Sequence, residues 1–250
     1  MSAVRVAVFG AAGRMGQEVC RAVTAADGLE LVAQIDVGDD PQEAVKGGAQ
    51  VAVDFTHPGV AMRNIEFCAV NGISVVVGTS GFGEARQREV RALLASAPDV
   101  RVLVAPNFSL GAVLMMRFAA AAAPYFENVE IVELHHPDKV DAPSGTAQRT
   151  AELIAEARAR AGSAPMPDAT NTGLEGARGA TVAGVPVHSV RLRGLVAHQE
   201  VLLGGPGEIL TIRHDSLDRA SFMPGVVLGC RNVGSLPPGL TVGLDALLDL

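Results

Sequence analysis

The chain of 250 residues contains no tryptophan, one tyrosine and only three cysteines. Few aromatic side chains are available to stack on bases, and the formal net charge is −7. Both features argue against binding to nucleic acid or to an anionic membrane surface. The cysteines, Cys20, Cys68 and Cys230, are far apart and form no CxxC pair. We therefore expect a protein of the reducing cytoplasm, without a disulfide framework or a metal site.

Long hydrophobic runs are also absent. The alanine-rich stretch Met115–Ala123 is shorter than a bilayer requires and contains Arg117. The first residues predict a strand rather than a secretory signal segment. Hydrophobic residues nevertheless make up 48% of the chain, enough for a substantial packed core. We expect neither a membrane partner nor a disordered chain.

The first hundred residues alternate short apolar runs with helical patterns. The runs are apolar throughout, which is typical of a parallel sheet covered by helices on both faces. This predicts an α/β fold of the doubly wound, Rossmann type. The predicted strands are Val4–Phe9, Leu29–Ile35, Val51–Phe55, Ile73–Val77 and Val100–Val104, and the predicted helices are Arg14–Ala25, Val60–Val70 and Glu84–Ala95.

The pattern changes after Pro106. Two longer helices and several strand-like runs follow, with a loop rich in glycine and proline over residues 162–179. The last three runs predict a meander of antiparallel strands in an open sheet, and the tail predicts helices. The helices are Leu110–Ala122, Gly145–Ala161, Arg219–Cys230 and Leu244–Leu248, and the strands are Val129–Leu134, Pro186–Arg193, His198–Leu203 and Glu208–Arg213.

A glycine-rich turn joins the first predicted strand to the first helix. Its glycines allow a tight turn, and the N–H groups at the helix N-terminus can hold a pyrophosphate. Asp36 ends the second strand, where an acid can bind the ribose hydroxyls of a dinucleotide and disfavours a 2′-phosphate. The alternatives are an ordinary turn and a solvated acid. The turn consists of Gly10, Ala11, Ala12, Gly13, Arg14, Met15 and Gly16, of which Arg14 could instead contact a phosphate and permit NADPH.

Small and polar residues follow two later strands, at the sheet edge where α/β proteins place ligands. Their size would let a nicotinamide ring approach the backbone, although both segments could be ordinary loops. They are Gly78, Thr79, Ser80 and Gly81, and Ala105, Pro106, Asn107, Phe108 and Ser109.

The densest polar segment runs from Glu133 to Thr146 and has the sequence ELHHPDKVDAPSGT. It offers proton donors and cations, and Gly145 and Thr146 open a helix that could bind a carboxylate. A metal site lacks a third ligand, and a nucleophilic Ser144 lacks the GxSxG turn. A polar surface loop is the remaining alternative.

Together these motifs resemble the dihydrodipicolinate reductase family of bacterial lysine and diaminopimelate synthesis. The resemblance covers nearly the whole chain, and the segment HHPDKVDAPSGTA, from His135 to Ala147, is its most specific part. It implies a dinucleotide-binding domain over residues 1–108 and 214–250. It also implies an inserted α+β domain over residues 109–213, which binds substrate and assembles a homotetramer through a mostly antiparallel sheet.

The resemblance further implies reduction of the cyclic dicarboxylate 4-hydroxy-tetrahydrodipicolinate by NADH or NADPH, with hydride transfer to ring C4 followed by protonation. His135 and Lys139 would be catalytic, and His136, Gly145 and Thr146 would bind substrate. The cofactor would contact Gly10, Ala11, Ala12, Gly13, Arg14, Met15, Asp36, Gly78, Thr79, Ser80, Ala105, Pro106, Asn107 and Phe108.

Three departures from the family pattern bear on these expectations. Ala11 and Ala12 stand where other members carry glycine or lysine, and Val37 stands where some carry arginine. These two differences leave NADH and NADPH both open. Asp218 replaces a usual serine. One rival function is that of another dehydrogenase, but this chain has neither the catalytic cysteine nor the Lys-Pro pair of such enzymes. Another is a nicotinamide-sensing regulator, but the chain has no length to spare for a DNA-binding module.

Overall fold

The computed structural model describes residues 2–248. The chain divides into two compact units. Unit 1 comprises Met1–Leu110 and Arg219–Leu250, and unit 2 comprises Gly111–Asp218. Each unit is built around its own sheet.

The sheet of unit 1 has six parallel strands in the order β11-β5-β4-β3-β1-β2. Strands β1 to β5 coincide with the short apolar runs of the sequence, and their side chains are largely buried. The parallel α/β fold predicted from these runs is confirmed. The strands are β1 (Val4–Phe9), β2 (Leu29–Ile35), β3 (Val51–Asp54), β4 (Ser74–Val77), β5 (Arg101–Val104) and β11 (Gly239–Val242).

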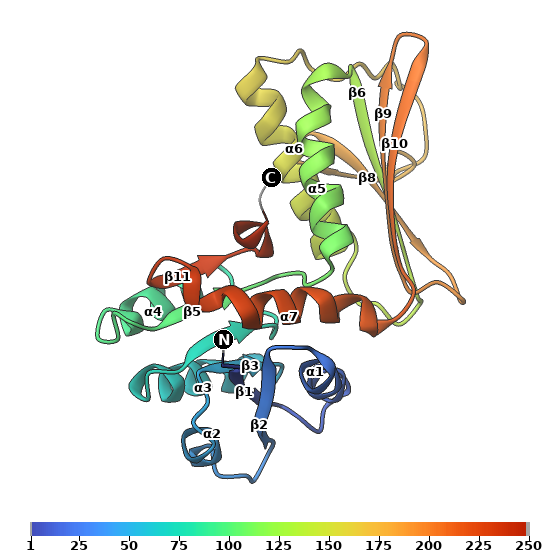
Figure 1. Cartoon of the computed structure of the whole chain (residues 1–250). Helices are drawn as coiled ribbons and strands as arrows, with labels where there is room; N and C mark the ends of the chain where they lie inside the picture. The colour runs from blue at the N-terminus through green and yellow to red at the C-terminus, as the bar shows by residue number, and fades with distance from the viewer. Residues whose placement is uncertain (1, 249–250) are drawn as a thin grey trace. The chain divides into compact units, whose positions relative to one another are not determined.

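Helices cover both faces of this sheet (Figure 1). One face presents Val75 and Val77 to a core that α3 and α4 complete. The opposite face carries Val76, which lies against Gly229 of α7. The helices are α1 (Arg14–Ala25), α2 (Gln42–Lys46), α3 (Pro58–Val70), α4 (Glu84–Leu94) and α7 (Met223–Asn232).

The strand order reverses at β1, which lies between β2 and β3. At such a switch point the connections leave the sheet in opposite directions and open a crevice beyond the carboxyl ends of the strands. The glycine-rich turn follows β1 at this point. The topology therefore places that turn where α/β proteins bind their ligands.

The sheet of unit 2 has five strands in the order β10-β9-β6-β8-β7. Helices α5 and α6 lie together beside it (Figure 1). Ala119 of α5 and Ile154 of α6 share one core with Ile131 and Leu203 of the sheet. The elements are α5 (Leu110–Ala122), β6 (Asn128–His135), α6 (Gly145–Ala161), β7 (Ala180–Val182), β8 (Val185–Arg191), β9 (Ala197–Gly205) and β10 (Glu208–Ser216).

The expected meander of the last three strands is wrong in one respect. Strands β9 and β10 form an antiparallel hairpin, but β6 lies between β8 and β9. Residues 192–196 pass round the end of β6, where Leu192 N–H donates to His135 C=O. Short spacing between two runs suggests a hairpin, yet it cannot show that a third strand separates them. As a result, β6 pairs in parallel with β8, and its last residue lies next to the connection between β8 and β9.

Among the α-helices and strands of the described residues, the short elements α2, β7 and β11 were not predicted. Each has only three to five residues, which is too short for a periodic pattern. Strand β11 adds to the edge beside β5, and β10 continues to Ser216 rather than ending at Arg213. The predicted helix Arg219–Cys230 begins with a 3-10 turn over Arg219–Phe222, before Pro224 in the first turn of α7.

Candidate active site

In unit 1 the glycine-rich turn follows β1 directly and is hydrogen-bonded to the end of β2. The N–H groups of Gly10 and Ala11 both donate to the carbonyl of Ile35. Gly10 has a φ of +80°, which favours glycine. A Cβ on Gly16 would lie 1.9 Å from the Gly10 carbonyl oxygen, so no other residue fits there. Helix α1 starts after Gly13 without a side-chain cap, and its N-terminus can serve an anion.

Asp36 lies directly beside this turn. Its Oδ2 accepts a hydrogen bond from the Ala12 N–H at 2.6 Å, and its Oδ1 accepts one from the Val37 N–H at 2.8 Å. A carboxylate has about four acceptor positions, so two remain for ribose hydroxyls. The residues present therefore fit the adenosine half of a dinucleotide, and Asp36 also holds the turn in shape.

The loop after β4 is organised by Asp54, the fully buried last residue of β3. Its carboxylate accepts hydrogen bonds from the hydroxyl of Thr79 at 2.6 Å and from the amide of Asn64 at 2.7 Å. Gly78 is packed so closely that a Cβ there would lie 2.2 Å from the Phe55 ring. Thr79 is thus a buried support, while Ser80 is exposed.

The segment after β5 forms a turn over the same edge of the sheet. Asn107 Oδ1 accepts a hydrogen bond from the Ser109 N–H at 2.8 Å. The buried ring of Phe108 lies 5.6 Å from that of Phe55, measured between centroids. Pro106 is exposed, and Ala105 is buried. The three segments predicted to contact the cofactor therefore follow β1, β4 and β5 of one parallel sheet, all at the carboxyl ends of the strands.

In unit 2, β6 ends at His135 with an acid on the same face two residues earlier. Val129, Ile131 and Glu133 point towards the core. Glu133 is 0% exposed, and its Oε2 lies 2.5 Å from His135 Nδ1. A carboxylate is thus buried at a position that the alternation of the strand would give to an apolar residue.

Arg191 balances the charge of Glu133. It is the partner of His135 in the β6–β8 register, and its Nη1 and Nη2 donate to both carboxylate oxygens at 2.8 Å. The Ser144 N–H also donates to Glu133 Oε1, at 3.2 Å. Burial raises the pKa of Glu133, but the hydrogen bonds from His135 and Arg191 outweigh it and lower that pKa to about 2.

The loop between His135 and α6 holds the second proposed acid. Lys139 Nζ donates to Asp141 Oδ1 at 2.6 Å, and the Asp141 carbonyl accepts from Arg191 Nη2 at 2.7 Å. Burial raises the pKa of Asp141, but hydrogen bonds from Lys139 and from backbone N–H groups, including that of Gly145, lower it below its usual value. His136 and Gly145 are exposed.

Helix α6 begins where these contacts converge. Ser144 is its N-cap, and the Ser144 hydroxyl accepts a hydrogen bond from the Ala147 N–H. Because Glu133 binds both His135 and Ser144, it brings the end of β6 next to the start of α6. The sequence placed His135, Lys139, Gly145 and Thr146 in one segment but did not identify Glu133 and Arg191 as the residues that hold it together. The available signal was a glutamate on the apolar face of a predicted strand.

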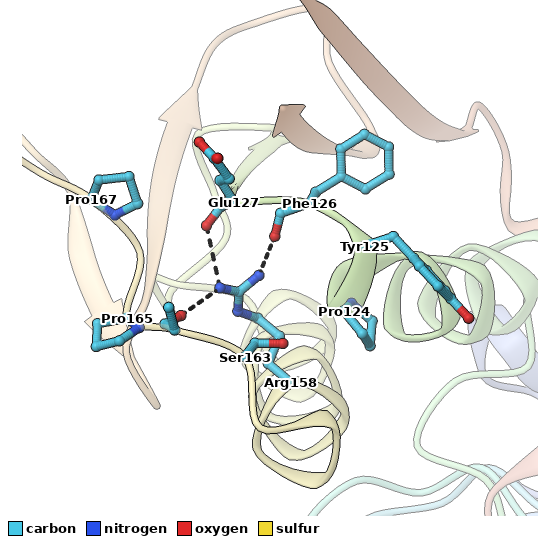
Figure 2. Close-up of a pocket in the computed structure, with 9 residues that line it drawn as sticks. Pro124, Tyr125, Phe126, Glu127, Arg158, Ser163, Pro165 and Pro167 are labelled. Carbon is cyan, nitrogen blue, oxygen red and sulfur yellow. Dashed lines mark hydrogen bonds between the residues drawn. The ribbon is translucent and has the colours of Figure 1, made fainter. Parts of the chain in front are cut away.

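A separate hollow of about 460 Å³ lies at the other end of α6 and contains none of the predicted site residues. Figure 2 shows Arg158 at its centre, with its guanidinium directed at backbone carbonyls. These belong to Ala123, Phe126, Glu127 and Ala164. Arg158 therefore fixes the C-terminal end of α6 to the segment after α5, and its donors are used in that structural role.

Residues 2–248 contain neither of two other kinds of site. No group of three or more His, Cys, Asp and Glu side chains is placed to hold a metal ion in that range. Within the same residues, no helix is both long and apolar enough to cross a membrane.

Comparison with known proteins gives full-length matches. Residues 4–108 match the family described as dihydrodipicolinate reductase, N-terminus, and residues 111–248 match dihydrodipicolinate reductase, C-terminus. A protein of Nocardia farcinica named 4-hydroxy-tetrahydrodipicolinate reductase is 63% identical over 247 residues, which is 99% of each chain. One of the same name from Streptomyces avermitilis is 62% identical over 250 residues and 100% of each chain.

A solved structure is similar over the same length. It is described as dipicolinate-bound dihydrodipicolinate reductase from Paenisporosarcina sp. TG-14. The alignment has a TM-score of 0.85 and 40% sequence identity, and it covers 98% of this chain and 100% of that one.

The charge of Glu133 predicts a specific loss of stability in acid. Its pKa in the folded protein, about 2, lies below the usual 4.5. The ionised side chain therefore contributes stability above pH 4.5, and this contribution falls as the pH falls towards 2. We expect the gap in unfolding free energy between the wild type and Glu133→Gln to be narrower at pH 3 than at pH 7, by on the order of 2 kcal/mol.

Urea unfolding at several pH values measures this gap. The control is Glu152→Gln, which removes a half-exposed partner of Arg149 and should give a small gap at every pH. A gap for Glu133→Gln that stays constant from pH 7 to pH 3 would contradict the assignment of an ionised, buried Glu133.

Proposed function

The chain belongs to the dihydrodipicolinate reductase family, and from this premise we propose that it reduces 4-hydroxy-tetrahydrodipicolinate to tetrahydrodipicolinate with NADH or NADPH. The matches to this family confirm the resemblance seen in the motifs of the chain. The protein is an oxidoreductase of lysine and diaminopimelate synthesis. The observation that carries the proposal is the cluster that joins His135, Lys139 and the start of α6 in one place.

Unit 1 is the proposed dinucleotide-binding domain, and unit 2 is the proposed substrate-binding and tetramerisation domain. The pyrophosphate would lie on Gly10, Ala11, Ala12, Gly13, Arg14 and Met15, and Asp36 would bind the adenosine ribose. The other cofactor contacts would come from Gly78, Thr79 and Ser80 and from Ala105, Pro106, Asn107 and Phe108. When bound, the reduced nicotinamide supplies a hydride to the substrate ring.

The substrate is a cyclic dicarboxylate, and the solved relative binds dipicolinate, which has the same arrangement of carboxylates. One carboxylate would bind the N–H groups of Gly145 and Thr146 at the start of α6, with His136 as a further donor. Asp141 already accepts a hydrogen bond from Lys139. A substrate carboxylate that binds Lys139 would therefore take the place of the Asp141 carboxylate.

His135 and Lys139 are the proposed proton donors. The 4-hydroxyl group leaves the substrate as water at or before hydride transfer. Hydride addition at C4 of the resulting unsaturated ring then leaves electron density towards the ring nitrogen as an enamine, which a proton must quench. A charged Lys139 beside a carboxylate or the ring nitrogen would also stabilise the developing charge. The protein thus positions the ring and delivers the proton.

Replacing either donor should slow the reaction strongly. We expect His135→Gln and Lys139→Ala each to lower kcat by about 10²–10⁴, because a positioned general acid contributes a factor of this size. The assay follows absorbance at 340 nm with enzymatically generated substrate, using NADH and NADPH in separate reactions.

Matched controls are His188→Gln and Lys46→Ala. His188 is a half-buried histidine of the same sheet bound to Glu130, and Lys46 is a lysine bound to Glu43. Both controls should keep wild-type rates. A loss below tenfold for both donor variants would reject their role, and folded wild-type protein that oxidises neither cofactor would reject the proposed reaction.

Cofactor preference should depend on the charge of Asp36. Asp39 Oδ2 accepts from the Asp36 N–H at 2.8 Å, so two acids lie at the end of β2, where a 2′-phosphate would be repelled. We propose NADH as the better cofactor. Asp36→Asn removes the charge and keeps an acceptor for Ala12, so the ratio of kcat/KM with NADPH to that with NADH should rise about tenfold, or 1.4 kcal/mol.

The control for this experiment is Glu43→Gln, which removes an exposed acid from the neighbouring helix α2. It should leave the ratio unchanged. An unchanged ratio in Asp36→Asn would show that Asp36 does not select between the cofactors.

We further propose a cytoplasmic homotetramer assembled through the sheet of unit 2. The edge strand β10 exposes Ile209, which is 74% accessible, and Leu210. Such an edge with apolar side chains needs cover. Light scattering should give four times the 25.7 kDa of one chain.

Ile209→Lys should shift the protein to smaller species, whereas Val37→Lys, at a fully exposed valine of unit 1, should not. A monomeric wild type would overturn the proposed assembly.

A further inference from the structure

Glu133 has a position and a set of partners that a general structural role does not require. It is the one acid on the inward face of β6, and four hydrogen bonds reach its two oxygens. Two come from Arg191, one from the Ser144 N–H and one involves His135 Nδ1. The Arg191 guanidinium and the Ser144 N–H hold the carboxylate in place, so its Oε2 presents a fixed acceptor to the imidazole.

The charge state of Glu133 determines which nitrogen of His135 carries a proton. Its bidentate partner Arg191 keeps the carboxylate ionised, in agreement with its lowered pKa. An ionised carboxylate can only accept hydrogen bonds. The contact of 2.5 Å therefore requires a proton on His135 Nδ1, in both the neutral and the charged ring.

We infer that Glu133, clamped by Arg191, is the positioning residue that fixes His135 as its Nδ1–H tautomer and makes Nε2 the atom that transfers the proton. This inference rests on the proposed function of His135. In the protonation step the Nε2–H bond of the imidazolium breaks, its electron pair stays on Nε2, and the proton goes to the substrate enamine. The product is the neutral Nδ1–H ring, which Glu133 continues to hold.

The position of His135 at the end of β6 explains why Arg191 of the neighbouring strand β8 is needed to hold Glu133. His135 is the last residue of β6, where strand pairing ends, and only 13% of its side chain is exposed. Its neighbour in the register is Arg191, so the residue that clamps Glu133 lies beside the histidine that Glu133 orients. A hydrogen bond from Nδ1 to a fixed acceptor restricts rotation of the imidazole about its Cα–Cβ and Cβ–Cγ bonds, and this limits where Nε2 points.

The first test is the tautomer of His135 in the wild-type protein. Long-range ¹⁵N–¹H NMR of the full chain, with the signal assigned by its loss in His135→Gln, should show the Nδ1–H form at a pH where the ring is neutral. In Glu133→Gln the side-chain amide can donate as well as accept, so the signal should move to the Nε2–H form or to a mixture. A wild-type Nε2–H form overturns the inference without need of any variant.

Kinetics separate positioning from a merely structural role. Glu133→Gln should lower kcat about 10–10⁴-fold, since loss of an orienting carboxylate costs up to about 10⁴ in other histidine-dependent sites, and it should change KM less than threefold. In a His135→Gln background the same substitution should lower kcat no further, because its effect acts through His135. An equal fall in both backgrounds would show that Glu133 only supports the fold, and would overturn the inference.

Glu130→Gln is the matched control, since Glu130 also binds a histidine, His188, at 2.7 Å in the same sheet. It should leave kcat unchanged. If Glu133→Gln does not fold, Glu133→Asp serves in both experiments, since it keeps the charge but shortens the reach to Nδ1. A fully active His135→Gln would reject the proposed function of His135 and with it the positioning role of Glu133. This failure can be distinguished from a wrong tautomer, because NMR determines the tautomer independently of activity.

Discussion

The buried carboxylate of Glu133 is the contact on which the proposed substrate site depends. A charge of this kind is costly inside a protein unless hydrogen bonds and an opposite charge surround it. Arg191, the Ser144 N–H and His135 meet that requirement from β8, α6 and β6. Because each partner belongs to a different element, satisfying one charge fixes the relative positions of all three. The local geometry of the site thus follows from the electrostatic requirement of a single side chain.

Unit 1 uses the same device at its own sheet. Asp54 is also 0% exposed and ends a strand, and it binds Thr79 of the next loop and Asn64 of α3. In both units a carboxylate buried at or near the carboxyl end of a strand organises the loops around it. The proposed ligand-binding loops are therefore supported from beneath by acids that need not touch a ligand.

Much of this organisation could be predicted from the sequence, and the limits have physical reasons. Strands β1 to β5 of unit 1 and helices α1, α5 and α6 follow from apolar runs and periodicity, and the turn at Gly10 from its place between strand and helix. The insertion of β6 between β8 and β9 could not be predicted, because pairing partners depend on tertiary packing. Glu133 and Arg191 are 58 residues apart, and no local pattern links them.

The two helix N-termini proposed to bind anions differ in what they offer. Helix α1 begins at Gly13 without a side-chain cap, so its donors can meet a pyrophosphate directly. Helix α6 is capped by Ser144, and the nearby Lys139 donates a hydrogen bond to Asp141. A substrate carboxylate that binds Lys139 must displace the carboxylate of Asp141. Only a ligand that also binds other donors competes well with Asp141. A second carboxylate on the substrate provides such contacts, so this arrangement favours dicarboxylates over monocarboxylates of the same ring.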